Sequence, residues 1–133
     1  MVVTRPKFLL ACDSSGHTAG YHVIAMGLRD AGVEVLAIGY AEPEEVARAA
    51  QQEGVHMVGY RVMDRDAVTL GGLVKEQLSD RGLADLPVVI GGIVRRDARA
   101  ELKKLGVNGV FGPGSKLQDI TDFVYAETRG EET

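Results

Sequence analysis

One of the three histidines, His17, has neighbours that would allow it to act as a ligand. It lies in the segment Ser15–Gly20, which follows the apolar run Phe8–Ala11 and leads into a helical pattern. The carboxyl end of a buried strand is where open α/β sheets hold their ligands. A neutral imidazole binds transition metals well, and a hydrogen bond to its second nitrogen orients the ring. We therefore expect His17 to contact a ligand.

Two glycine-rich segments each follow another apolar run. They are Gly91-Gly92 and Gly112-Pro113-Gly114-Ser115. Glycine allows a sharp backbone turn and lets a bulky ligand approach the main chain closely. Taken singly, each segment would indicate only a tight turn between a strand and a helix. Together with His17, they predict a wide, flat-sided binding site.

Short apolar runs alternate with longer amphipathic segments along the chain, which is typical of repeated βα units and a parallel sheet. Five such units favour a flavodoxin-like α/β fold, with a five-stranded parallel sheet in the order 2-1-3-4-5 and helices on both faces. The predicted strands are 8–11, 34–38, 57–62, 87–90 and 109–111, and the predicted helices are about 19–30, 43–53, 66–80, 96–105 and 117–128.

The switch point of such a sheet lies between its first and third strands, so the loops that follow strands should supply the ligand contacts. Pro43 suits the first turn of a helix, and Asp66 is a candidate helix cap. Glycines that follow helical runs indicate where helices end. The expected ligand loops are 12–19, 63–66, 91–95 and 112–116, and the helix-ending glycines are Gly32, Gly54, Gly82 and Gly106.

Length and composition indicate a single domain over residues 1–133, because 133 residues with 45% hydrophobic content can fill one core. The tail 129–133 is expected to fray. The chain has one cysteine, Cys12, which excludes an internal disulfide and is interpreted as a small residue at a strand end. No nucleophile elbow, phosphate loop or paired-histidine metal helix occurs in the sequence, so we assign no catalytic residue.

The charge pattern bears on possible partners. The net charge of −4 arises from 15 basic and 19 acidic residues that are interspersed, which argues against nucleic acid as a partner. No apolar run is long enough to span a membrane, and residues 1–7 lack the pattern of an export signal. We expect a cytoplasmic protein that makes no membrane contact.

Four stretches of the sequence together resemble the cobalamin-binding domain family of adenosylcobalamin-dependent mutases and methionine synthase. The similarity is greatest to the small subunit or C-terminal domain of methylmalonyl-CoA mutase, and it covers nearly the whole chain. The stretches are the Gly-His-x-x-Gly core at Gly16–Gly20, Leu28–Val35, Pro87–Ile93, and Leu105–Val107 leading to Val110–Ser115.

The resemblance implies a cofactor and a set of contacts. In that family a histidine replaces dimethylbenzimidazole as the lower ligand of cobalt, and the displaced nucleotide tail lies between the sheet and its helices. His17 would be the cobalt ligand here, with Ser15 as its hydrogen-bond partner, and adenosylcobalamin is the expected form of the cofactor. The implied cofactor-binding residues are Ser15, Gly16, His17, Thr18, Gly20, Arg61, Met63, Gly91, Gly92, Gly112, Pro113 and Gly114.

The resemblance also implies a partner. The chain would be the non-catalytic, cofactor-carrying subunit of an isomerase, working with a large catalytic barrel subunit that holds an acyl-CoA substrate. Cleavage of the cobalt–carbon bond would produce the radical that starts the rearrangement, so the cofactor carries the chemistry and this chain anchors it.

This sequence departs from the family pattern at the cofactor loop and at the third strand. Ser15 replaces the aspartate that bonds the ligand histidine, and Ala11 replaces a lysine of the same loop. Met63 is a fair substitute for the family's leucine, but Arg61 replaces a serine. A guanidinium there needs a charged partner, such as Asp13, Asp64 or Asp66, or else a phosphate of the tail.

Two alternatives follow from these departures and from the fold. An ion pair of Arg61 would partly occupy the groove, which would make the chain a regulatory or binding module with an altered cofactor site. A phosphoacceptor receiver domain shares the strand order, but it needs an acidic pair after the first strand, an aspartate ending the third and a lysine ending the fifth. Here Asp13 stands alone, Arg61 and Met63 lie near the third strand's end, and Lys116 comes after the glycine turn.

Overall fold

A computed structural model describes residues 5–16 and 18–129, which form one five-stranded parallel sheet with helices between the strands. The strand order is β2-β1-β3-β4-β5, which confirms the predicted flavodoxin-like topology. The strands are β1 (Lys7–Cys12), β2 (Glu34–Tyr40), β3 (Met57–Val62), β4 (Val88–Gly92) and β5 (Gly109–Phe111), and the helices are α1 (Ala19–Asp30), α2 (Pro43–Glu53), α3 (Ala67–Asp80), α4 (Ala98–Lys104) and α5 (Leu117–Arg129).

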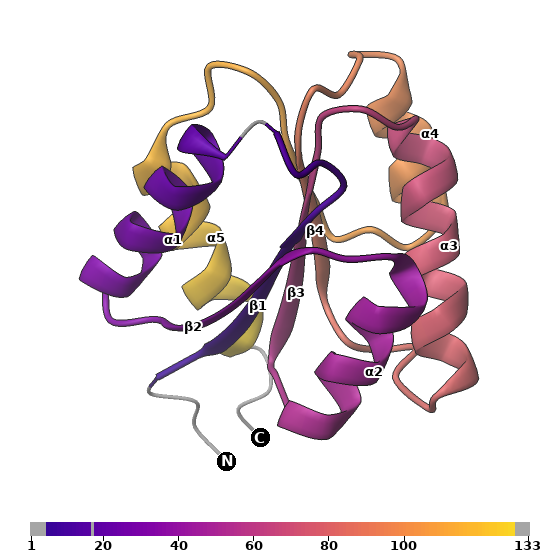
Figure 1. The fold of residues 1–133 in the computed structure, drawn as a ribbon, viewed down its shortest axis with the longest axis horizontal. Helices are drawn as coiled ribbons and strands as arrows, with labels where there is room; N and C mark the ends of the chain where they lie inside the picture. The colour runs from indigo at the N-terminus through magenta and orange to yellow at the C-terminus, as the bar shows by residue number, and fades with distance from the viewer. Residues whose placement is uncertain (1–4, 17, 130–133) are drawn as a thin grey trace.

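The sheet is the middle of three layers (Figure 1). Helices α1 and α5 cover one face, and α2, α3 and α4 cover the other. Side chains alternate between the faces of a strand, and β1 divides accordingly. Leu9 and Ala11 pack toward α2 and α3, whereas Phe8, Leu10 and Cys12 pack toward α1 and α5. Because β1 is covered on both faces, its apolar run is continuous, as it is in other buried parallel strands.

Several helix boundaries follow the chemistry expected from the sequence. Glu42 and Glu45 form a capping box at the start of α2, with Pro43 at its first position. The carboxylate of Asp66 accepts a hydrogen bond from the Thr69 amide and caps α3, as predicted. The glycines at the helix ends have positive φ angles, which only glycine adopts readily, at Gly32, Gly54, Gly82 and Gly106.

Several predicted boundaries differ from the structure, and three of these differences have a clear physical reason. Gly91 and Gly92 are the last residues of β4 rather than a loop, because they pair with Arg61 and Val62 of β3. Helix α4 begins at Ala98 instead of about residue 96, since Arg96 and Asp97 form a turn before it.

The third difference is the end of β2. This strand continues past residue 38 to Tyr40, because a register shift against β1 keeps Gly39 and Tyr40 paired. Arg129, which was expected to fray, is the last residue of α5. No helix within the described residues is both long and apolar enough to cross a membrane.

Candidate functional site

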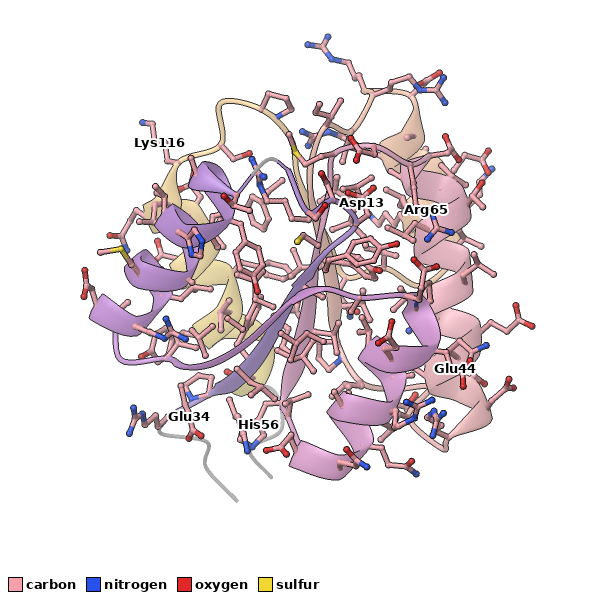
Figure 2. The ribbon with its side chains drawn as sticks, in the orientation of Figure 1. Asp13, Glu34, Glu44, His56, Arg65 and Lys116 are labelled. Atoms are coloured by element: carbon pink, nitrogen blue, oxygen red, sulfur yellow. The ribbon has the colours of Figure 1, made fainter. Side chains whose placement is uncertain are left out.

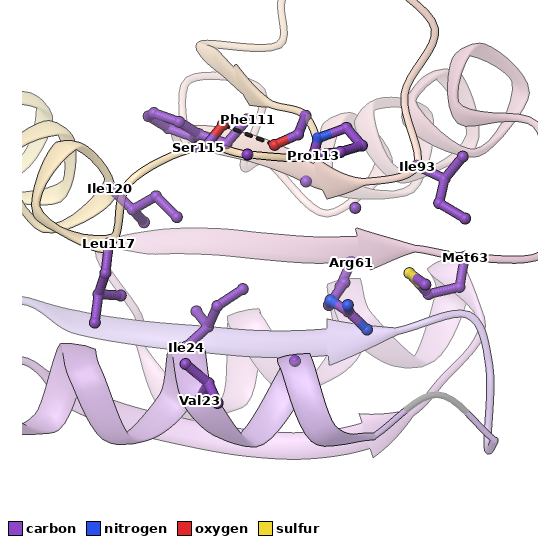
Figure 3. A pocket seen from close by; sticks show the side chains of 15 residues that line it. Val23, Ile24, Arg61, Met63, Ile93, Phe111, Pro113, Ser115, Leu117 and Ile120 are labelled. Carbon is purple, nitrogen blue, oxygen red and sulfur yellow. Dashed lines mark hydrogen bonds between the residues drawn. The ribbon is translucent and has the colours of Figure 1, made fainter.

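A groove opens at the carboxyl edge of the sheet, between β3, β4 and β5 on one side and α1 and α5 on the other (Figure 3). Its volume is about 370 Å³. The lining residues are Gly20, Val23, Ile24, Arg61, Met63, Gly91, Gly92, Ile93, Phe111, Gly112, Pro113, Gly114, Ser115, Leu117 and Ile120.

The groove narrows inward into an apolar end of about 40 Å³. Phe8 and Leu10 of β1, Val89 of β4 and Ile120 of α5 surround it, with Gly59 of β3 at its wall. A Cβ on Gly59 would lie 2.3 Å from the ring of Phe8, so only glycine permits Phe8 its present position. The groove therefore has an apolar inner end and an opening at the sheet edge, a shape suited to a flat, largely apolar group.

Glycines at the end of β4 keep the groove open by bringing main chain, instead of side chains, to its surface. Gly92 has a φ of 98°, and a Cβ there would lie 2.3 Å from the carbonyl oxygen of Val62. A Cβ on Gly91 would lie 3.3 Å from the carbonyl oxygen of Phe111. The opposite rim is the turn after β5, where the Ser115 hydroxyl donates to the Gly112 carbonyl at 2.7 Å (Figure 3).

Asp13 joins two of the loops beside the groove (Figure 2). Its carboxylate is only 4% exposed and accepts hydrogen bonds from three backbone amides. The nitrogen atoms of Met63, Asp64 and Arg65 lie 2.7, 3.1 and 2.8 Å from it. This carboxylate, which follows β1, therefore fixes the loop that follows β3, and with it the position of Met63 in the groove wall.

The β3–α3 loop is held from its other side as well. The Arg65 guanidinium donates to Glu42 at 2.9 Å, and the Tyr40 hydroxyl donates to the same carboxylate at 2.9 Å. This hydrogen bond to Glu42 raises the pKa of Tyr40. The contacts bind the ends of β2 and β3 to each other, so the sheet edge beside the groove is a connected unit.

The β1–α1 loop borders the groove mouth. Within it, the Ser14 hydroxyl accepts a hydrogen bond from the Gly16 amide at 3.1 Å, and the Cys12 thiol donates to the Ser14 carbonyl at 3.2 Å. Cys12 is buried at the strand end, as predicted. Ser15, Gly16 and Thr18 are exposed. His17, the predicted cobalt ligand, lies outside the described residues.

Ten of the twelve predicted binding residues line two adjoining hollows, whereas Ser15 lines neither and His17 is not among the described residues. Gly16, Thr18 and Gly20 border a hollow over the β1–α1 loop, which Arg61 and Met63 also line. Eight predicted residues line the groove itself, namely Gly20, Arg61, Met63, Gly91, Gly92, Gly112, Pro113 and Gly114. The topology thus brings together residues from four separate loops and strand ends, as the strand order predicts.

Arg61 does not close the groove, contrary to the altered-site alternative. Its guanidinium extends over Gly20 at the start of α1, where a Cβ on Gly20 would lie 2.4 Å from Nη2. Of the partners considered, Asp13 binds the loop amides, and Asp66 accepts from the amide and hydroxyl of Thr69. These hydrogen bonds lower the pKa of Asp66.

The sequence analysis missed the apolar side chains of the groove. Val23 and Ile24 of α1 face Leu117 and Ile120 of α5 across the opening. Val23 is 59% exposed and Ile93 is 57% exposed, and both side chains line the groove. The signal was available, because Val23 and Ile24 depart from the polar outer face that a helix of this kind normally presents.

Two buried tyrosines near the site support the sheet. Burial raises the pKa of Tyr21 and of Tyr60, so both remain neutral at ordinary pH. Tyr21 donates to the Leu10 carbonyl and accepts from the Gly39 amide, each at 2.9 Å, while Tyr60 donates to the Ala41 carbonyl. Tyr21 thereby satisfies main-chain groups on either side of the register shift between β1 and β2.

The strand order defines a flavodoxin-like domain, and the groove lies at the carboxyl edge of its sheet. Solved structures of two different kinds of protein share this fold. A cobalamin-binding protein from Desulfitobacterium hafniense has a TM-score of 0.77 at 19% identity, over 92% of this chain and 59% of that chain. A receiver domain of a Francisella response regulator has a TM-score of 0.75 at 14% identity, over 96% of this chain and 100% of that chain.

The sequence distinguishes between these two kinds of protein. Residues 8–120 match the B12 binding domain, and the chain belongs to that family. It is 36% identical over 110 residues to the 2-hydroxyisobutanoyl-CoA mutase small subunit of Aquincola tertiaricarbonis, covering 82% of this chain and 81% of that protein.

Two further relatives show the same domain alone and as part of a longer chain. The pivalyl-CoA mutase small subunit of Xanthobacter autotrophicus is 35% identical over 129 residues, covering 92% of this chain and 84% of that protein. The methylmalonyl-CoA mutase of Escherichia coli is 36% identical over 117 residues, which are 86% of this chain but 16% of that protein. The domain therefore occurs among these relatives both as a small subunit and within a much larger mutase chain.

Proposed function

We propose that this chain binds adenosylcobalamin and presents it, as a small subunit, to the separate catalytic subunit of an acyl-CoA mutase. The observation that carries the proposal is the open, glycine-lined groove that begins at the β1–α1 loop and enters the domain between α1, α5 and the sheet. Relatives named as mutase small subunits, which this chain matches over most of their length, supply the class of reaction.

The residues present fit this cofactor. A benzimidazole nucleotide tail is flat and mainly apolar at its end, and the inner groove offers Phe8, Val89 and Ile120 as walls. The groove volume of about 370 Å³ lies within the range of about 300–1,000 Å³ that is typical of small-molecule sites. At Gly92, where a side chain would collide with Val62, the main chain itself borders the ligand space. The corrin ring would lie over the loops at the sheet edge.

Each part of the site would have a separate task. His17 would be the lower cobalt ligand, with Ser15 as its hydrogen-bond partner, while Gly16 and Thr18 border the corrin. Met63, held by Asp13 through its amide, would support the corrin near the groove mouth. When bound, the cofactor supplies the radical chemistry of the rearrangement, so this chain's residues need only anchor and orient it.

The catalytic partner completes the proposal. A large barrel subunit would hold the acyl-CoA substrate and cover the exposed face of the corrin. The exposed side chains of Val23 and Ile93 lie on the groove rim, where they would be covered in the loaded complex. On this proposal, the purified chain loaded with cofactor shows no mutase activity until the catalytic subunit is added.

A visible absorption titration with hydroxocobalamin and adenosylcobalamin tests the proposal. We expect a saturable spectral change as the protein replaces the benzimidazole ligand, and loss of that change in His17→Ala. His22→Ala is the matched control, because His22 is exposed on α1 and does not line the groove. If the folded wild-type chain produces no spectral change with either cobalamin, the proposed function is wrong.

A further inference from the structure

The side chain of Arg61 stands where the two hollows of the site meet. It lines the groove between α1 and the sheet, the apolar inner end of that groove, and the hollow over the β1–α1 loop. Gly20 and Met63 also border both the groove and the loop hollow. A ligand that reached from the loop into the groove would therefore lie beside Arg61, Gly20 and Met63 (Figure 3).

Charge sets Arg61 apart from its surroundings. Among the 15 described residues that line the groove, it is the one with an ionisable side chain. The others are glycines, aliphatic or aromatic residues, Met63, Pro113 and Ser115. An arginine that is half-buried in apolar walls interacts strongly with an anion, because less water screens the charge there than at the surface.

Steric fit favours one position for the guanidinium. It lies against Gly20, where the absence of a Cβ leaves the room that Nη2 occupies. The group is therefore placed beside the first turn of α1, where the helix dipole also favours negative charge. Helix and arginine together therefore favour an anion at the passage between the hollows.

We propose that Arg61 binds the phosphodiester of the cobalamin nucleotide tail and so selects for a cofactor with a complete tail. This inference rests on the proposed function. The phosphodiester joins the corrin side chain to the ribose, so it must lie between a corrin over the loops and a base in the groove. A guanidinium binds phosphate oxygens through two parallel hydrogen bonds. Its five N–H donors allow it to keep other contacts at the same time.

The test compares two probes that differ by the phosphate alone. Aquocobinamide ends at the aminopropanol group, and cobinamide phosphate adds a phosphate ester to that group without ribose or base. The ratio of their dissociation constants, measured by absorption or calorimetric titration, gives the phosphate contribution directly. For wild type we expect cobinamide phosphate to bind at least about tenfold more tightly, as for a hydrogen bond to a charged group.

Variants of Arg61 show whether this residue is the cause. In Arg61→Met the ratio should fall close to unity while aquocobinamide binds as in wild type, and Arg61→Lys should give an intermediate ratio. Gly20→Ala provides an independent variant, because the new Cβ displaces the guanidinium but alanine suits a helix. It should reduce the ratio even if Arg61→Met does not fold. Excess coenzyme A, another phosphate source, should not change the wild-type ratio.

The outcomes separate the inference from the proposed function. If wild type binds cobalamin, and if Arg61→Met and Gly20→Ala both show the wild-type ratio of the two dissociation constants, then Arg61 does not recognise the tail. In that case the inference alone is wrong. Equal losses for both probes in Arg61→Met would also contradict it, since the side chain would then act on the corrin. If excess coenzyme A brings the wild-type ratio to unity, the anion site binds the acyl-CoA instead of the cofactor tail, and the inference is wrong. If wild type binds no corrinoid, the proposed function fails as well.

Discussion

Asp13 shows how a single residue holds the site together. Its buried carboxylate accepts hydrogen bonds from the amides of Met63, Asp64 and Arg65. From the sequence, Asp13 was one of three possible partners for Arg61, because its position after β1 indicates only that it lies at the sheet edge. Which groups a carboxylate meets there depends on the path of the β3–α3 loop, and no local pattern in the sequence specifies that path.

Removing this carboxylate should loosen the loop and destabilise the domain. Asp13→Ala leaves three amides without their acceptor, so we expect the free energy of unfolding to fall by about 1–3 kcal/mol. Urea unfolding monitored by circular dichroism measures this. Asp64→Ala is the control, because Asp64 is adjacent to Met63 in the same loop and exposed. Its free energy of unfolding should fall far less. Equal stability of Asp13→Ala and wild type would show that the loop does not depend on the carboxylate.

Gly92 is a second residue on which the groove depends. Its φ of 98° and the carbonyl oxygen of Val62, 2.3 Å from a built Cβ, both exclude a side chain. We expect Gly92→Ala to reduce stability by about 2 kcal/mol or more in a urea titration. Gly82→Ala is the matched control, because Gly82 has a φ of 76° but open space around it. If Gly92→Ala loses no more stability than Gly82→Ala, the main chain at Val62 shifts to accept the new Cβ without a measurable cost.

At the scale of elements, α3 depends on its cap at Asp66. The Thr69 amide and hydroxyl lower the pKa of this carboxyl below its unfolded value of about 4. A carboxyl whose pKa is lower in the folded than in the unfolded protein stabilises the fold at pH values above the unfolded pKa. That stabilisation is lost as the pH falls through the folded pKa. Asp66→Ala should therefore lower Tm at pH 7, and the difference from wild type should shrink below about pH 4. Scanning calorimetry at both pH values tests this, and a difference that is independent of pH would contradict it.

Element boundaries were predictable where a local signal marks them and unpredictable where pairing decides them. Pro43, Asp66 and the helix-ending glycines each act within one turn, so α2 and α3 begin as expected. Gly91 and Gly92 have low strand propensity, which suggested a loop. Their pairing with Arg61 and Val62 instead extends β4, because hydrogen bonding between neighbouring strands outweighs the preference of single residues.

At the scale of the whole molecule, topology alone does not determine function. A receiver domain and a cobalamin-binding protein share this fold with similar TM-scores. The strand order was predictable from the βα rhythm, and so was the meeting of the glycine segments at one edge. The depth of the groove was not predictable. It depends on how far apart α1 and α5 lie where Ile24 and Ile120 line the groove.

Filling the groove should stabilise the entire domain. A ligand that binds only the folded state adds about 2.7 kcal/mol at a concentration one hundred times its Kd. For a domain of this size we expect a rise in Tm of several degrees with adenosylcobalamin, measured by calorimetry with the free cofactor in excess. Free dimethylbenzimidazole riboside is a useful comparison, because on the proposed binding mode it would occupy the tail groove alone. No rise with adenosylcobalamin would show that it does not bind the folded chain.

The most direct measurement of the central claim is the electron paramagnetic resonance spectrum of the chain loaded with cob(II)alamin. The protein would be labelled uniformly with the heavier stable isotope of nitrogen and the cofactor left unlabelled. If His17 ligates cobalt and the tail lies in the groove, each cobalt line is split into a doublet with labelled protein and a triplet with unlabelled protein. A triplet that persists with labelled protein would mean that the benzimidazole still ligates cobalt, which contradicts the proposed binding mode.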